Sequence, residues 1–202
     1  MAFLAQLNLA ETPANVHVEP LPSTGILYVF SMLGRQTQDG DHDDDCHEGS
    51  DHPGISQILC DEDHARLTRR SRPPGIRTFD PAAVSYHTKL SLPSTSKYTR
   101  DPQTLWLQWP VEELERMVDF ECDLGYLYRR HVGSRADHLL LGHAGSIQEA
   151  VTRPGERLLL QIDSDDNAGM MWGDGGTIYF LITDEALEER SFSAVRSDTQ
   201  CG

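Results

Sequence analysis

An acidic, glycine-rich loop late in the chain has the residue types that bind divalent cations. In the stretch DSDDNAGMMWGD, Asp163, Asp165 and Asn167 alternate, and Asp174 stands at the twelfth position. A calcium-binding hand uses oxygen ligands at positions 1, 3 and 5, a glycine at position 6 and a bidentate glutamate at position 12. Position 6 is Ala168 here, and strands rather than helices are expected on both sides. The loop is therefore an imperfect metal motif, and a solvated hairpin tip is the simpler interpretation.

Three side chains of the same region could instead contact a small molecule. Gln161 precedes the loop, Asp166 lies within it, and Trp172 stands among polar turn residues. An aromatic ring beside carboxylates is typical of the wall of a shallow pocket. In the alternative interpretation, Trp172 covers the edge of a core.

A second group of metal-ligating residue types lies at 39–52. The stretch DGDHDDDCHEGSDH holds three histidines, one cysteine and seven acidic residues. Imidazole and thiolate groups bind zinc and similar metals. The spacing of His42, Cys46 and His47 matches no established zinc pattern, however, and the composition predicts a flexible acidic insertion over 34–54.

No residue pattern in the chain indicates a catalytic centre. His131, Ser134 and Asp137 lie close together in sequence but lack the Gly-x-Ser-x-Gly context of a nucleophile elbow. The sequence also has no phosphate-binding loop, dinucleotide fingerprint or Cys-x-x-Cys pair. We expect no catalytic residues and no cofactor, with a bound divalent cation as the alternative.

Apolar runs predict the strands that would hold the acidic loop. The run FLAQLNLAE at 3–11 alternates, as in a strand with one buried face, and TGILYVFSML at 24–33 is almost continuously apolar, as in a strand covered on both faces. The runs LLLQIDSDD at 158–166 and GGTIYFLIT at 175–183 show the same two patterns in the same order.

The two pairs of runs can be aligned. Gln161 then falls on Gln6 and Tyr179 on Tyr28, and only the connecting loop shortens. Two segments in the same order at similar spacing predict an internal duplication into two similar halves, related by a pseudo-twofold axis. The half-repeats cover about 3–33 and 158–183.

The clearest helix begins at Pro110, where acidic residues in the first turn suit the helix dipole. Its apolar residues recur at helical spacing to about Tyr128. A short helix is expected over 184–196, and further strands over 55–60 and 82–93. These elements predict an α+β fold of mostly antiparallel sheets with a few helices.

The composition limits the partners. A chain of 202 residues fits one domain over 1–202, and its net charge of −15 repels phosphate backbones and anionic membranes. We therefore expect no nucleic-acid or membrane partner, whereas a basic protein partner would suit the surface. The four scattered cysteines and the absence of a secretory signal predict a cytoplasmic protein with reduced thiols.

Four short motifs carry a family resemblance over most of the chain. They are Phe-Leu-Ala-Gln at Phe3–Gln6, Leu-Leu-Gly-His at Leu140–His143, Leu-Gln-Ile-Asp at Leu160–Asp163, and Trp-Gly-Asp-Gly-Gly at Trp172–Gly176. Together they resemble the YwqG-like family, bacterial proteins that carry a domain of unknown function. The resemblance implies an α+β fold with internal duplication and no established activity. Family members usually have a further stretch before the first motif, so a shortened first half is expected here.

We therefore expect a non-catalytic binding or protein-interaction module. The alternative is a metal- or small-molecule-binding protein, including a metal-dependent enzyme, that uses the acidic loop at 163–174. What the carboxylates of that loop face decides between the two.

Overall fold

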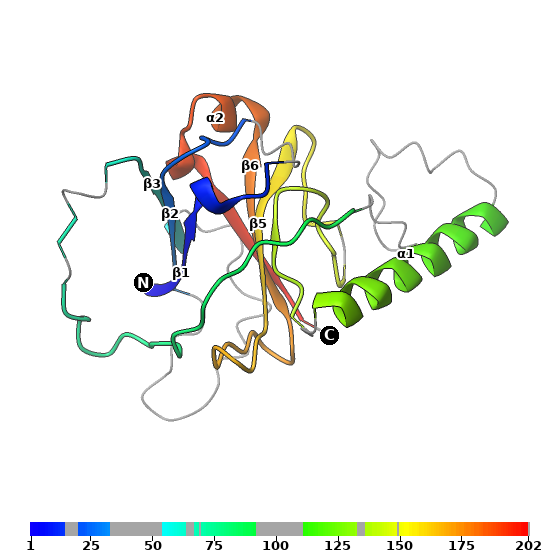
Figure 1. Ribbon diagram of the computed structural model, residues 1–202, viewed down its shortest axis with the longest axis horizontal. Helices are drawn as coiled ribbons and strands as arrows, with labels where there is room; N and C mark the ends of the chain where they lie inside the picture. The colour runs from blue at the N-terminus through cyan, green and yellow to red at the C-terminus, as the bar shows by residue number, and fades with distance from the viewer. Residues whose placement is uncertain are drawn as a thin grey trace.

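The computed structural model describes most of the chain, and its strands form two antiparallel sheets with few helices (Figure 1). The described residues are 1–14, 20–32, 54–63, 67, 68, 70–91, 111–132, 136–148 and 150–201. The predicted α+β class is confirmed. No helix in these ranges is long and apolar enough to cross a membrane. The predicted acidic insertion, apart from Gly54, lies outside the described residues.

The two sheets contain three and four strands. The first has the order β1 (Ala2–Asn8), β2 (Ile26–Ser31) and β3 (Ser56–Asp61). The second has the order β4 (Leu139–Leu140), β5 (Glu156–Asp163), β6 (Thr177–Thr183) and β7 (Arg196–Gln200). Every neighbouring pair is antiparallel, as expected for strands joined by hairpins.

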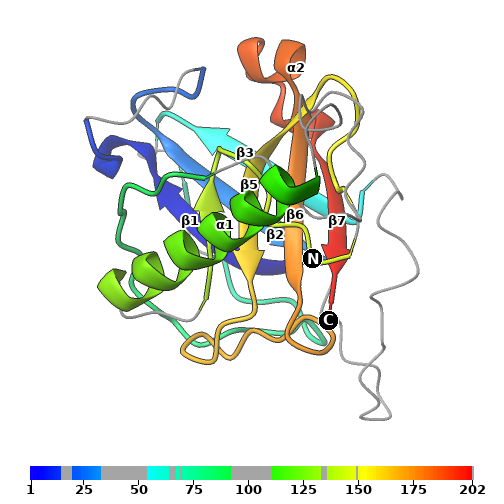
Figure 2. The same ribbon diagram turned by 90° about the vertical axis from the view of Figure 1, so that its right-hand side faces the viewer.

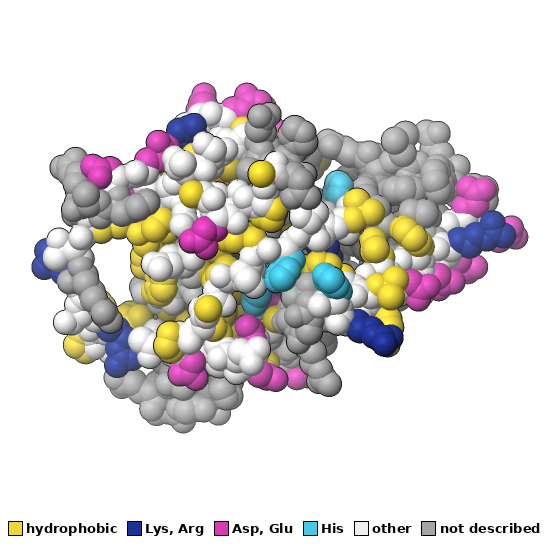
Figure 3. Space-filling view, in the orientation of Figure 1, with side chains coloured by type: hydrophobic (Ala, Val, Ile, Leu, Met, Phe, Trp, Pro, Cys, Tyr) yellow, Lys and Arg dark blue, Asp and Glu magenta, His cyan; other side chains and the backbone are white. Residues whose placement is uncertain are grey.

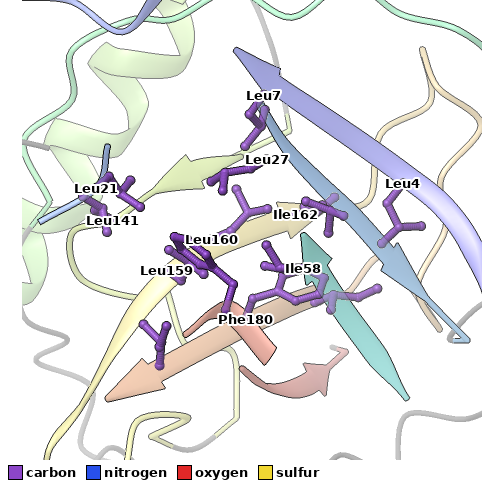
Figure 4. Close-up of a cluster of buried hydrophobic side chains, with 14 of the residues drawn as sticks. Leu4, Leu7, Leu21, Leu27, Ile58, Leu141, Leu159, Leu160, Ile162 and Phe180 are labelled. Carbon is purple, nitrogen blue, oxygen red and sulfur yellow. The ribbon is translucent and has the colours of Figure 1, made fainter. Parts of the chain in front are cut away.

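The main core lies between the sheets (Figure 4). Alternate side chains of a strand point into it, because successive residues face opposite sides of the sheet, and the irregularities in β1 and β5 shift this alternation by one residue. The first sheet contributes Leu4, Leu7, Leu27 and Ile58, and the second contributes Leu159, Leu160, Ile162 and Phe180. Burial of one such aliphatic side chain stabilises the fold by about 1.5–3 kcal/mol.

A smaller apolar cluster covers the outer face of the second sheet. It contains Val151, Leu158, Tyr179 and Leu181, with Leu139 packed against them. The first six residues of β6 are consequently all buried. The almost continuous apolar run of this strand follows from burial on both faces.

The hairpins β1–β2 and β5–β6 have the same register. Gln6 pairs with Tyr28, and Gln161 pairs with Tyr179, which are the residues that the sequence alignment places on each other. Each first strand also has an irregularity at the aligned position, next to Leu4 in β1 and between Leu158 and Leu160 in β5. The duplication itself stays a prediction.

The ends of the two hairpins close in the same way. Leu9 N donates to Gly25 O at 2.9 Å, and Ser164 N donates to Gly176 O at 3.0 Å. In both hairpins the third strand passes very close to the glycine. A Cβ at Gly176 would lie 2.1 Å from Gln200 O, nearer than any side-chain carbon can approach.

The helices differ in part from expectation. The helix α1 (Val111–Val132) extends four residues beyond the predicted end at Tyr128. The helix predicted over 184–196 is wrong beyond its first turns, because α2 (Asp184–Glu188) ends in a turn where Arg190 has φ 56°. A 3-10 turn, η4 (Phe192–Ala194), follows, and β7 begins at Arg196. Another 3-10 turn, η1 (Leu9–Glu11), follows β1.

The strand predicted over 82–93 is wrong for the described residues 82–91, which form no regular element. No sheet edge pairs with this segment in the described chain. Side-chain contacts attach it instead: Lys89 contacts Asp137, and Ser91 Oγ accepts a hydrogen bond from His143 N. Side chains rather than a backbone ladder therefore hold this segment against the protein.

A half-buried ion pair joins the start of β5 to β7. Arg196 donates from Nη2 to Glu156 Oε2 at 2.7 Å and from Nε to Oε1 at 3.1 Å. Burial alone would raise the pKa of Glu156, but the hydrogen bonds from Arg196 and from Arg153 N outweigh it and lower that pKa below 4.5. A carboxylate stabilised in this way contributes to folding stability while it stays charged.

Substitution Gly176→Ala is expected to destabilise the fold by about 2 kcal/mol or more, because the added methyl group must displace the backbone of β7. The control is Gly145→Ala, whose Cβ would meet the Gln161 amide at 3.7 Å, an ordinary contact. Urea unfolding of both variants measures the difference. Equal effects of the two substitutions would contradict the close approach.

Substitution Glu156→Gln is expected to lower the free energy of unfolding by about 2 kcal/mol at neutral pH. The difference from the unmodified chain should shrink as the pH falls below 4.5, because the lowered folded-state pKa stabilises only the charged carboxylate. Glu62→Gln, which removes the exposed pair with Arg190, should have a much smaller effect. Denaturant titrations at several pH values check both expectations.

Candidate functional site

Asp163 faces the protein rather than an open loop. Its Oδ1 accepts hydrogen bonds from Ser164 N at 3.0 Å and Thr177 Oγ1 at 2.9 Å, and its Oδ2 accepts one from Asp137 N at 2.8 Å. These three donors use much of the carboxylate's capacity to accept hydrogen bonds. The side chain therefore joins β5, β6 and the segment before β4.

Asp165 stabilises the tip of the hairpin. Its Oδ1 accepts from Asn167 N at 2.9 Å and Asn167 Nδ2 at 3.1 Å, as in an Asx turn. Its Oδ2 lies 3.4 Å from His138 Nε2. Asp163 N donates to His138 Nδ1 at 3.1 Å, so Nε2 carries the proton that points to Asp165.

The remaining candidate ligands of the loop lie at the surface. Asp166, Asn167 and Asp174 are exposed. Within the described ranges, no three His, Cys, Asp or Glu side chains gather in a way that could hold a metal ion. His138 thus links the backbone of Asp163 to the carboxylate of Asp165, and the Asp163 carboxylate binds Asp137 N, Ser164 N and Thr177 Oγ1 instead.

Trp172 lies in the core with 3% of its surface exposed. Its ring packs edge to face on the Phe79 ring, and the two ring centroids lie 5.5 Å apart. The Arg77 guanidinium lies over the Phe79 ring, 4.9 Å from its centroid. The residue therefore covers the edge of the core, as in the second of the two interpretations. Its indole nitrogen is buried without a hydrogen-bond partner among the described atoms.

Gln161 is also buried, with 3% exposed, and its amide holds a loop in place. Its Oε1 accepts from Gly145 N at 3.0 Å, and its Nε2 donates to Asp137 O at 2.9 Å. Its neighbour on β6, Tyr179, donates its hydroxyl to Gly145 O at 2.8 Å, and burial raises the pKa of this phenol. The two strands thereby fix the segment that forms one wall of a cleft.

That cleft has a volume of about 260 Å³ and lies between α1, the segment 89–91 and the segment 137–145. Its lining residues are Lys89, Leu90, Ser91, Cys122, Leu124, Gly125, Asp137, Leu139, His143, Ala144, Gly145 and Gln161. Sequence reasoning missed it because its walls come from stretches far apart in the chain. The only sequence signal was the Leu140–His143 motif of the family resemblance.

The polar groups of the cleft are mostly engaged. Lys89 Nζ contacts both Asp137 oxygens, at 2.5 and 2.6 Å, and lies 5.0 Å from the centre of the Tyr128 ring. Partial desolvation lowers the pKa of His143. The exposed thiol of Cys122 also lines the cleft.

The outer surface of α1 is both apolar and acidic. Figures 1 and 2 show the helix outside the two sheets, and Figure 3 shows hydrophobic side chains among charged ones along it. Phe120, Tyr126 and Leu127 are 50%, 59% and 59% exposed. Asp119 and Asp123 are exposed beside them. Soluble proteins usually bury the aromatic and leucine side chains of a helix, so the exposure of these three side chains is unusual.

Comparison with family models matches residues 1–201 to a family described as Domain of unknown function (DUF1963). No curated protein matches the chain significantly. The function therefore has to be inferred from the geometry and charge of the chain itself.

Gln161→Leu is expected to destabilise the fold by about 2 kcal/mol, because the partly buried hydrogen bonds to Gly145 N–H and Asp137 C=O are lost. Gln6→Leu is the matched control, since Gln6 has the same register position in the first hairpin but is exposed. Urea unfolding measures both variants. A mild effect at Gln161, equal to that at Gln6, would show that the amide does not hold the loop.

Proposed function

The chain belongs to the family described as Domain of unknown function (DUF1963), which has no stated activity. From its surface, we propose that the protein is a protein-interaction module whose helix α1 binds a basic, amphipathic partner. A cytoplasmic location and the YwqG-like affiliation are part of this proposal. The exposed apolar and acidic side chains of α1 are the observation that carries it.

These side chains form a continuous stripe along α1. Phe120, Asp123 and Leu127 stand at i, i+3 and i+7, and such residues lie on one face of a helix. Asp119 and Tyr126 flank that face. Apolar residues supply the area that a partner can bury, and the carboxylates select the charge of that partner.

The net charge of the chain supports the same partner chemistry. At −15, the molecule attracts basic proteins over several ångströms and repels acidic ones. The three arginines of α1, Arg116, Arg129 and Arg130, only partly offset its six acidic residues. A cationic amphipathic segment would pack its apolar side chains on the stripe and pair its basic side chains with the acidic residues of α1.

The alternative functions have less support. The cleft of about 260 Å³ is smaller than the roughly 300–1,000 Å³ of most ligand pockets, and its ion pair occupies Lys89 and Asp137. In the acidic loop, Asp163 and Asp165 already accept hydrogen bonds from the protein. A cation there would have to displace these donors.

The test uses the full chain and a fluorescent synthetic peptide of alternating Lys and Leu blocks that forms a cationic amphipathic helix. Binding by anisotropy should weaken with added salt, because part of the attraction is electrostatic. Phe120→Ser with Leu127→Ser should weaken it by about tenfold or more, since the apolar contact is lost. Val84→Ser, which changes an exposed apolar residue outside α1, should leave it unchanged.

A matched pair of charge variants separates the site from the overall charge. Asp119→Lys with Asp123→Lys changes the net charge by the same amount as Glu188→Lys with Glu189→Lys, whose side chains are exposed around the end of α2. The α1 variant should weaken binding more than the α2 variant. Equal losses, or binding unaffected by either pair, would overturn the assignment to α1.

A further inference from the structure

The two hairpins differ in what lies against their outer edges and faces. In the second sheet, β4 pairs antiparallel with the outer edge of β5, with Leu139 opposite Gln161. Leu139, Ala144 and Val151 then cover the outer side chains of β5 and β6. Leu158 is consequently only 1% exposed.

In the first sheet, the side chains at the corresponding positions of β1 and β2 are more exposed to solvent. By register, Phe3 corresponds to Leu158, Tyr28 to Tyr179 and Phe30 to Leu181. Phe3 is 45% exposed and contacts the Phe30 ring edge-on at 5.6 Å. Tyr28 and Phe30 are only partly buried. In the described part of the chain, no strand pairs with the outer edge of β1.

Within the described residues, the edge of β1 also lacks several of the features that protect edge strands from pairing with another chain. Native proteins use charged residues, prolines, very short strands or a covering element for this purpose. The other edges have one of them: β4 has two residues, β7 carries Arg196 and Asp198, and β3 lies against η4. β1 has no charge and no proline over seven residues, and its single bulge lies near its start.

We propose that β1 pairs with β1 of a second copy of this chain, so that the two three-stranded sheets join edge to edge. A twofold axis makes this pairing antiparallel, which is the direction that β4 has on β5. Phe3 and Phe30 of each copy then lie near the joined edge. This surface shares no residue with α1, so it is independent of the proposed partner site.

The charge distribution selects a second copy over a charged partner. Two chains of net charge −15 repel each other over most of their surfaces. They can approach closely where neither carries charge, and β1 and β2 contain no charged residue at all. A basic segment would gain nothing at this neutral edge, whereas an identical uncharged strand matches it in hydrogen bonding and in apolar side chains.

The experiment is sedimentation velocity on the full chain over the micromolar range. The unmodified chain should show a concentration-dependent dimer. Gln6→Lys should raise the dimer dissociation constant by about tenfold or more, because lysine on the edge strand of both copies repels. Gln57→Lys makes the same chemical change at an exposed position of the same sheet, on β3, and should leave the dimer intact.

Three results would overturn the proposal: a monomer throughout the range, a dimer insensitive to Gln6→Lys, or equal weakening by the two variants. Circular dichroism confirms that each variant is folded. Hydrogen exchange supplies a second measurement that needs no variant. The β1 amides should exchange more slowly as the concentration rises, and slow exchange in the dilute monomer would show that the chain itself covers this edge.

Discussion

The strand β6 is buried along nearly its whole length, because apolar clusters cover both of its faces. One face contacts the first sheet through the main core, and the other contacts the smaller cluster around Val151 and Tyr179. The second cluster requires the segment that includes β4 to cross over the sheet. That segment contains turns and few paired backbone groups, so polar side chains must hold it there.

This requirement explains why several polar side chains with chemically suggestive types are structural. Gln161 and Asp163 bind the backbone of Gly145 and Asp137, and Tyr179 donates to the same loop. Asp165 closes the hairpin tip. Asp163 and Asp165 already accept backbone hydrogen bonds, so a ligand would have to break those bonds to reach their carboxylates. The exposed apolar side chains that a partner could bury lie elsewhere, on α1 and on β1.

These two surfaces differ in charge, because the surface of α1 is acidic and the edge of β1 is neutral. The outer surface of α1 combines exposed aromatic and leucine side chains with carboxylates. The edge of β1 is apolar and uncharged in a chain of net charge −15. Charge steers an encounter and discriminates among partners, whereas a neutral edge offers backbone hydrogen bonds and apolar area. The two surfaces therefore suit different partners, one basic and one identical to the chain itself.

The sequence by itself determined the hairpins. The apolar patterns of β1, β2, β5 and β6 predict their positions, and the alignment of Gln6 with Gln161 anticipates their shared register. Strand periodicity is a local property, so it can be recognised without knowing what packs on each face. The family match over 1–201 shows a domain of unknown function, and the YwqG-like affiliation inferred from the Leu140–His143 and Trp172–Gly176 motifs stays a prediction.

The tertiary structure decided what those local patterns could not. β4 has two residues and β7 is polar, so neither has a detectable period, and each is a strand only because β5 or β6 offers it an edge. The segment 82–91 alternates but pairs with no strand among the described residues. Whether Trp172 lines a pocket or the core, and whether Asp163 faces a cation or the backbone of Asp137, depends on segments distant in sequence. Burial and hydrogen-bond satisfaction are properties of the assembled chain, so only the packed structure assigns them.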